Sequence, residues 1–282
     1  MGDDNTQIKR HSLLLYFVLV FVLSWGGVLI VVGPSELGFP ERMNTMSVYM
    51  MMLIGPSVAG ILLTGLISGR AGFRELLSRL TKWRVSARWY VVALLTAPLL
   101  ATAILFALSL FSSEFLPMIF AADDKGTILV NGIVAGLMVG FFEELGWTGF
   151  AIPRLRQRYG ILTIGLIVGF LWGLWHFILF WERGSFLGAL SLALLLVQLF
   201  SWLPAYRVLM VWIYDRTESL LVVMIMHLSL VAIQSILIPP LTGGSLLTYI
   251  LAWAVVLWVV VAAIVVINRG KLSQQSLPKQ VA

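Results

Sequence analysis

The sequence contains no cysteine and few charged residues. Without cysteine the chain has no disulfide bond, no thiolate nucleophile and no cysteine-ligated metal site. Charged residues make up 11% of its 282 residues, whereas soluble domains carry about 25%. Hydrophobic residues reach 60%, which also excludes the polar composition of disordered chains. The composition therefore predicts a protein that resides in a membrane.

Long apolar runs occupy most of the chain. A membrane-spanning helix needs about 20 apolar residues, and eight runs approach or exceed that length. We expect the first run to be an uncleaved helix, because no small-residue cleavage site follows it. The spans leave only short loops, so residues 1–282 are predicted to form a single all-α, multi-pass transmembrane domain with about eight helices. The predicted spans cover residues 13–32, 47–67, 89–111, 127–152, 161–181, 186–202 or 186–214, 220–237 and 246–267.

Lysine and arginine residues gather on one side of the predicted topology. With eight spans, the inner segments hold 16 of the 19 basic residues, and Arg42, Lys125 and Arg183 remain outside. Basic loops mark the cytoplasmic side, so both termini are predicted to be cytoplasmic in a cell membrane. The basic residues behind the net charge of +6 are therefore predicted to lie at the membrane faces. We expect the lipid bilayer, not nucleic acid, as the partner.

Residues 69–88 separate the second and third spans. Phe73, Leu76, Leu77 and Leu80 share one helical face, whereas the basic residues of the segment lie elsewhere. This pattern predicts a short amphipathic helix on the inner leaflet. A solvated connector is the alternative.

Two of the predicted spans carry glycines at every fourth position. Such spacing lets neighbouring helices approach closely. We therefore expect these two spans to pack tightly against other helices along their glycines, which are Gly132, Gly136 and Gly140 in span four and Gly165, Gly169 and Gly173 in span five.

Few ionisable residues lie inside the predicted spans. A central charge costs at least about 2.5–3.5 kcal/mol in hydrocarbon, so such residues usually serve a function. The second half of the chain holds four of them, Glu143, Glu144, His176 and His227. Arg207 lies at the edge of a span, and we expect its side chain to snorkel toward the surface.

The spacing of these residues predicts that they share one depth. Gly160 lies midway between Glu143 and His176 and is a natural helix end. In an antiparallel hairpin that turns there, both residues lie about 16 positions, or roughly 24 Å, from the turn. His227 lies about nine residues, or roughly 14 Å, from the inner end of its span, which agrees if the hairpin tip projects into the cytosol. The sequence therefore predicts a Glu/Glu/His/His cluster inside the membrane, nearer the inner face.

Two carboxylates and two imidazoles are compatible with more than one function. A desolvated glutamate can act as a general base on water, and imidazoles can stabilise an oxyanion, transfer protons or bind a metal. Such a set is able to hydrolyse an amide bond. A proton-coupled transporter uses the same residue types and remains an alternative.

The motifs around these residues resemble those of the type II CAAX-protease and bacteriocin-processing family, called CPBP or Abi. Residues 143–150, EELGWTGF, resemble its first motif, E-E-x-x-x-R. Residues 172–176, WGLWH, resemble its second motif, F-x-x-x-H, with Trp for Phe. The approach to His227 resembles the approach to its third motif, H-x-x-x-N. The similarity extends over about residues 140–235.

The resemblance implies a multi-pass intramembrane endopeptidase with a catalytic core at residues 127–238. Its substrate would be a membrane-embedded or membrane-associated peptide, cleaved near the cytoplasmic side. In that family the first glutamate activates water, and two histidines and an asparagine surround the scissile carbonyl. The resemblance carries these roles to Glu143, His176 and His227, with Glu144 beside the base.

The resemblance leaves the metal open. The family is often labelled as metalloproteases, and Glu143, His176 and His227 are the candidate ligands for zinc. Because only three ligands are present and Glu143 would serve twice, we favour a mechanism without a tightly held metal.

Two positions depart from the family pattern. Thr148 stands at the position of the motif-one arginine and Val231 at that of the motif-three asparagine. Losing one oxyanion donor typically costs about 10²–10³ in rate. Gln234, two turns beyond His227, is a candidate substitute, and a hydrogen bond to a neighbouring helix is its alternative role. A catalytically impaired protein of the same fold, acting as a membrane partner or in bacteriocin immunity, therefore stays open beside the protease.

Overall fold

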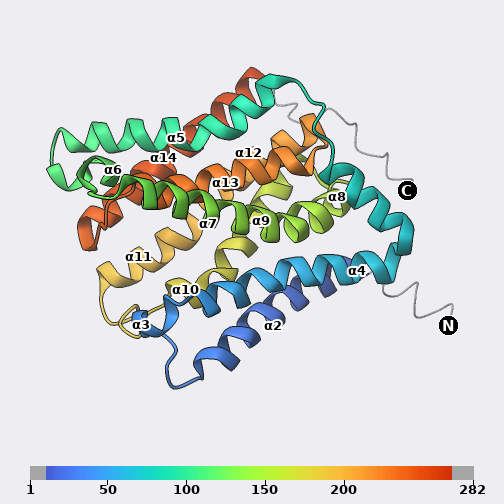
Figure 1. Ribbon diagram of the computed structural model, residues 1–282, viewed down its shortest axis with the longest axis horizontal. Helices are drawn as coiled ribbons and strands as arrows, with labels where there is room; N and C mark the ends of the chain where they lie inside the picture. Colours follow the sequence, from blue (N-terminus) through green and yellow to red (C-terminus); the bar gives the residue numbers. More distant parts are fainter. Residues whose placement is uncertain (1–10, 269–282) are drawn as a thin grey trace.

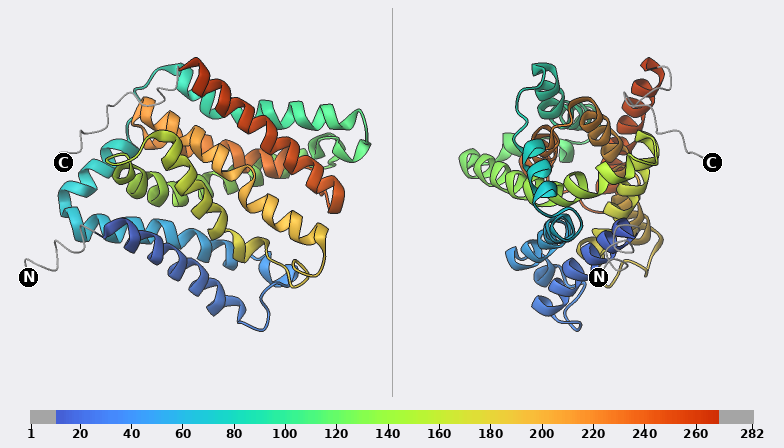
Figure 2. Two further views of the ribbon diagram at one scale, coloured as in Figure 1. Left: turned by 180° about the vertical axis from the view of Figure 1, so that it is seen from behind. Right: turned by 90° about the vertical axis from the view of Figure 1, so that its right-hand side faces the viewer.

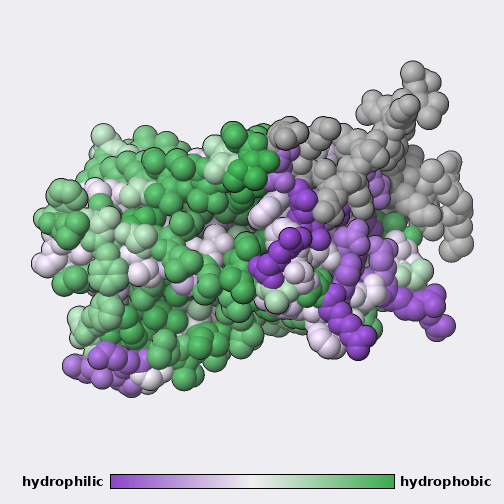
Figure 3. All heavy atoms as spheres, turned by 90° about the horizontal axis from the view of Figure 1, so that it is seen from above, coloured by the Kyte–Doolittle hydropathy of each residue, from purple (hydrophilic) through white to green (hydrophobic). Residues whose placement is uncertain are grey.

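The computed structural model describes residues 11–268, and all regular structure in this range is helical. Seven of the described helical segments are long and apolar enough to cross a membrane. The long helices run side by side along one direction (Figure 1), and the same arrangement is seen from behind (Figure 2). Hydrophobic residues cover the middle of the molecule, whereas hydrophilic residues gather mainly at one end (Figure 3). The protein is therefore an all-α, multi-pass membrane protein.

Each predicted span corresponds to one long helix or to consecutive shorter ones. The long helices are α2 (Ser12–Val32), α4 (Met46–Leu80), α5 (Ala87–Ser109), α7 (Lys125–Gly146), α9 (Ile161–Trp175), α11 (Ala189–Phe200), α12 (Leu203–Thr217), α13 (Leu220–Leu237) and α14 (Gly243–Ile267). The short elements are α3 (Pro40–Met43), a 3-10 turn (Ser113–Phe115), α6 (Met118–Ala121), a π-helical turn (Trp147–Ala151), α8 (Ile152–Leu155) and α10 (Phe177–Phe180).

Three of the predicted spans contain an interruption of the regular α-helix. Span four changes from α-helix to the π-helical turn after Gly146. Span five breaks at His176, whose side chain bonds the Trp172 carbonyl and so competes with the backbone ladder. Span six divides between α11 and α12, where Pro204 lacks an N–H to continue the earlier helix. Two of these breaks, those after Gly146 and at His176, lie beside the predicted site residues.

The amphipathic segment forms the last part of α4. The backbone turns at Gly69, which adopts φ 53°, and the helix ends at Leu80, earlier than predicted. Leu76 and Leu80 pack against residues of α7 and α13, whereas Phe73 and Leu77 are exposed. The segment is thus amphipathic and anchored on the bundle. Its position on the inner leaflet stays a prediction.

The glycine stripes bring backbones into close contact, as expected. A Cβ atom on Gly136 of α7 would lie 2.5 Å from the Leu228 carbonyl oxygen of α13. A Cβ atom on Gly165 of α9 would lie 2.5 Å from the Val208 side chain of α12. These contacts draw α7 to α13 and α9 to α12. The predicted site residues lie on these helices, except for His176, which directly follows α9.

Polar contacts tie together the end at which α2 begins and α14 ends (Figure 1). Arg156, after α8, pairs with Asp215 of α12 at 2.6 Å. Arg79 of α4 donates to the Tyr214 hydroxyl at 3.0 Å. This end carries most of the described basic residues. Residues 1–10 and 269–282 lie outside the described range, so the cytoplasmic placement of the termini stays a prediction.

Single-cysteine labelling tests the orientation, since the natural chain offers no background thiol. Ser78, in the last part of α4, and Asp123, before α7, are both exposed and lie at opposite ends. We expect a membrane-impermeant maleimide to label Ser78→Cys from the cytoplasmic side alone and Asp123→Cys from the other side alone. Labelling of both variants from one side contradicts this topology.

Alanine at Gly136 tests the close contact between α7 and α13. The added methyl group would meet a backbone carbonyl, and overpacking of this kind costs about 1–3 kcal/mol. We expect Gly136→Ala to lower the thermal unfolding midpoint in detergent. The matched control is Gly26→Ala in α2, where no atom lies within 4 Å of the new Cβ. An equal midpoint for the two variants would show that α7 and α13 are not held this closely.

Candidate active site

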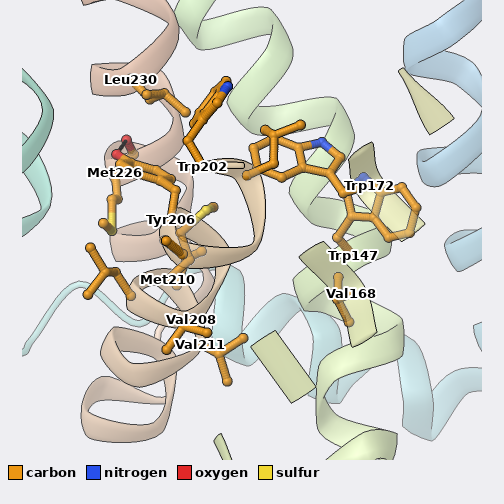
Figure 4. Close-up of a cluster of buried hydrophobic side chains, with 14 of the residues drawn as sticks. Trp147, Val168, Trp172, Trp202, Tyr206, Val208, Met210, Val211, Met226 and Leu230 are labelled. Carbon is orange, nitrogen blue, oxygen red and sulfur yellow. Dashed lines mark hydrogen bonds between the residues drawn. The ribbon is translucent and has the colours of Figure 1, made fainter. Parts of the chain in front are cut away.

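Trp172 of α9 lies at the centre of the predicted site. Its indole is almost fully buried, and Nε1 donates a hydrogen bond of 2.7 Å to Glu143 Oε2. The indole meets the rings of His227 and His176 edge-on, with centroid separations of 5.2 and 5.5 Å. Figure 4 shows this indole reaching from α9 toward Trp202 at the start of α12. The structure thus brings Glu143, His176 and His227 together around one side chain.

The two glutamates occupy the end of α7, directly before the π-helical turn. The backbone N–H of Trp147 donates to the backbone carbonyl oxygens of both Glu143 and Glu144, which marks the change in helical winding. Such π-helical turns are frequent at functional sites. Both side chains are buried, so each carboxylate requires partners from neighbouring helices.

Glu144 receives hydrogen bonds on both oxygens. Arg207 Nη1 donates to Oε1 and to Oε2, each at 2.9 Å. His227 Nδ1 lies 2.8 Å from Oε1, and the Thr148 hydroxyl donates to Oε2. Glu144 therefore joins α7, α12 and α13 and has a full set of donors.

Arg207 is fully buried in this ion pair, so the expectation that it snorkels is wrong. Its Cζ lies 4.2 Å from the centre of the Trp172 ring, which adds a cation–π contact. The sequence pattern placed Arg207 at the edge of a span because the hydropathy of the segment does not show the break before α12. A signal was present, since apolar residues flank Arg207 on both sides from Leu203 to Val211.

Glu143 has a different environment from Glu144. Trp172 is the hydrogen-bond donor to its Oε2, and within residues 11–268 no side chain donates to Oε1. The side chain is 2% exposed. One oxygen of this carboxylate is therefore available to a small polar molecule.

Both histidines use Nδ1 for their hydrogen bonds. Because carbonyl and carboxylate oxygens only accept, Nδ1–H of His176 donates to the Trp172 carbonyl at 2.8 Å, and Nδ1–H of His227 donates to Glu144. In the neutral form each ring therefore presents Nε2 as an acceptor. Either Nε2 becomes a donor only when the ring is protonated.

Among the described residues, neither of the two α13 positions considered for an oxyanion donor bonds to the glutamates or histidines of the site. Gln234 is exposed two turns beyond His227, and its role as an oxyanion donor stays a prediction. Val231 is half-buried one turn beyond His227 and offers no polar atom. Sequence reasoning assigned no role to Trp172 or Thr148, whose hydrogen bonds orient the two glutamates.

The described arrangement does not fit a three-ligand metal site. Within residues 11–268 no group of three or more His, Cys, Asp or Glu side chains is disposed to hold a metal ion. Glu144 is committed to Arg207, and the guanidinium places a positive charge beside the remaining candidates. We therefore derive no chemical step through a metal.

Several buried donors beside the site have no hydrogen-bond acceptor among the described residues. They belong to side chains in mutual contact. Tyr16 meets Trp147 edge-on at 5.8 Å, Trp147 meets Trp175 at 6.0 Å, and Trp175 meets His176 at 4.7 Å. Buried donors usually find a partner, so their number here is unusual. The unpartnered groups are Tyr16 Oη, Trp147 Nε1, Trp175 Nε1, Arg207 Nε and Arg207 Nη2.

Comparison with known proteins identifies the segment that builds this site. Residues 125–233 match the model of a family described as type II CAAX prenyl endopeptidase Rce1-like. The protein is 33% identical over 76 residues to CAAX prenyl protease 2 of Methanococcus maripaludis, and this match covers 27% of the chain and 23% of that relative. The resemblance of the motifs is thereby confirmed: over residues 125–233 the protein is similar to the Rce1-like type II CAAX prenyl endopeptidase family.

Proposed function

We propose that this protein is an intramembrane endopeptidase that hydrolyses a peptide bond with water activated by Glu143. The observation that carries this proposal is the different bonding of two adjacent buried carboxylates. Glu144 is saturated by Arg207, His227 and Thr148, whereas Glu143 keeps one oxygen without a donor. Two carboxylates with distinct environments are a common basis for distinct catalytic roles.

The proposed reaction begins with a water molecule at Oε1 of Glu143. The carboxylate takes a proton as the water oxygen attacks the scissile carbonyl carbon, and the carbonyl oxygen becomes an oxyanion. The tetrahedral intermediate then collapses with loss of the C–N bond, and Glu143 returns the proton to the departing amine. Trp172 holds the carboxylate in position through Oε2.

The unpartnered donors favour a peptide as the substrate. Peptide carbonyl groups are acceptors, and a chain bound beside Tyr16, Trp147 and Trp175 would supply them. The name of the Methanococcus maripaludis relative, CAAX prenyl protease 2, is compatible with a membrane-associated peptide. We propose such a peptide as the substrate class.

The basic hairpin tip supports cleavage near the cytoplasmic side. Glu143 lies close to the C-terminal end of α7, and Arg154, Arg156 and Arg158 follow it before the turn. Basic residues favour the cytoplasmic face. We therefore propose a cell-membrane location with both termini in the cytoplasm.

Replacement of Glu143 tests this function. Removal of a general base typically costs about 10²–10⁴ in rate. We expect Glu143→Gln to reduce cleavage of a fluorescent membrane peptide by at least about 10²-fold in liposomes, because the amide cannot accept the proton of the water. The measurement is the initial rate for purified protein, with plain and C-terminally lipidated peptides compared.

The matched control is Glu41→Gln, which changes an exposed glutamate of α3 in the same way. This variant should cleave at the wild-type rate. Cleavage that survives Glu143→Gln would overturn the proposal. If the wild type cleaves no peptide but carries out proton-driven solute flux, the transporter is favoured. If it cleaves no peptide and its biological phenotype persists in Glu143→Gln, the non-catalytic membrane partner is favoured.

A further inference from the structure

Arg207 has more hydrogen-bond donors than its ion pair uses. A guanidinium carries five N–H groups. Nη1 serves both oxygens of Glu144, whereas Nε and Nη2 have no acceptor among residues 11–268. The side chain is 0% exposed, so these donors are also removed from bulk water. An unsatisfied buried donor costs about 1–3 kcal/mol, and more on a charged group.

The cation–π contact does not satisfy these donors. The indole of Trp172 covers one face of the guanidinium, with Cζ 4.2 Å from the ring centre. The N–H bonds lie in the plane of the guanidinium and point from its edge. Nε and Nη2 therefore remain able to donate to an acceptor at that edge.

Arg207 and Glu143 contact the same indole. The guanidinium stacks on the ring of Trp172, and Glu143 accepts from the Nε1 of that ring at 2.7 Å. The guanidinium and the carboxylate proposed to activate water therefore meet around one side chain. Among residues 11–268, Arg207 is the one lysine or arginine side chain that bonds to either of the two buried glutamates of the site.

The histidines are poorer donors for an oxyanion in this arrangement. Nδ1–H of each ring is already used, so Nε2 donates only after protonation. The family asparagine is replaced by Val231, which has no polar side-chain atom. A guanidinium stays protonated throughout the working pH range and needs no titration to act.

We propose that Arg207 is a catalytic residue whose Nε and Nη2 hold the oxyanion, in place of the asparagine absent at position 231. This inference rests on the proposed peptidase function. As the carbonyl oxygen gains the electron pair of the C=O π bond, the two N–H groups bind it while Nη1 stays on Glu144. When the C–N bond breaks, the oxygen regains its double bond and the donors release it.

The exchange Arg207→Lys tests this role. Lysine keeps a positive charge for Glu144 but lacks the planar set of donors. We expect kcat for the membrane peptide to fall about 10²–10³-fold, as after loss of an oxyanion donor, with KM changed less than about threefold. The matched control, Arg156→Lys, makes the same exchange in the ion pair with Asp215 and should keep the wild-type kcat.

A hydrogen-bond donor introduced at position 231 distinguishes a catalytic role of Arg207 from a role limited to pairing with Glu144. We expect Val231→Asn to raise kcat at least tenfold in the Arg207→Lys background and less than threefold in the wild type. A merely structural role of Arg207 predicts no such recovery. Unchanged kcat in Arg207→Lys, or a loss that Val231→Asn does not reverse, overturns the inference.

Folding and function are controlled separately. Thermal unfolding in detergent reports whether Arg207→Lys is folded. If Arg207→Lys is unfolded, the test is Val231→Asn in the otherwise wild-type protein. A tenfold rise in kcat would mean that the oxyanion lacks a donor in the wild type and would overturn the inference. If wild-type protein shows no Glu143-dependent cleavage, the proposed function fails and the oxyanion role fails with it. Cleavage that depends on Glu143 but not on Arg207 leaves the function intact and refutes this inference alone.

Discussion

The ion pair between Glu144 and Arg207 is the constraint on which the site depends. Two adjacent glutamates in an apolar bundle carry a large desolvation cost, and an opposite charge with good geometry offsets much of it. Arg207 meets this need from a helix far along the chain, with both contacts at 2.9 Å. Removing one partner of a buried pair typically costs about 3–5 kcal/mol, so the pair fixes the relative positions of α7 and α12. His227 joins α13 to the same carboxylate.

The glycine contacts make this polar arrangement possible. Side chains can meet only if the helix axes are close, and the stripes on α7 and α9 allow backbone contact with α13 and α12. Trp172 then spans the space between the two helix pairs and reaches Glu143, both histidines and Arg207. The apolar packing and the polar chemistry are therefore two aspects of one geometry. Saturation of Glu144 leaves its neighbour Glu143 as the carboxylate available to water.

Much of this architecture was accessible from sequence. Hydropathy located the apolar segments, and glycine spacing predicted the close helix contacts. The positions of Glu143 and His176 about Gly160 predicted their convergence, and their common neighbour Trp172 agrees with it. Each of these patterns lies within one segment or is centred on one turn between two helices. Residue spacing along the sequence is therefore enough to detect it.

The role of Arg207 was not accessible in this way. Its partner lies 63 residues away, and hydropathy does not show the break before Pro204 that moves the arginine into the bundle. Hydropathy also does not show the break at His176, where the side chain bonds the Trp172 carbonyl, or the π-helical turn after Gly146. Thr148 stands where the family motif has an arginine, so the motif's guanidinium is missing there. In the fold, Arg207 of α12 brings a guanidinium to Glu144.

The origin of the new carboxylate oxygen tests the central claim most directly. In a single turnover in ¹⁸O-labelled water, attack by water held at Glu143 places one ¹⁸O atom in the new C-terminal carboxyl group of the product and none in the protein. The measurement is mass spectrometry of the product and of the proteolytic fragment that contains Glu143. Label in the side chain of that fragment would reveal an acyl-enzyme on the carboxylate and would contradict direct attack by water.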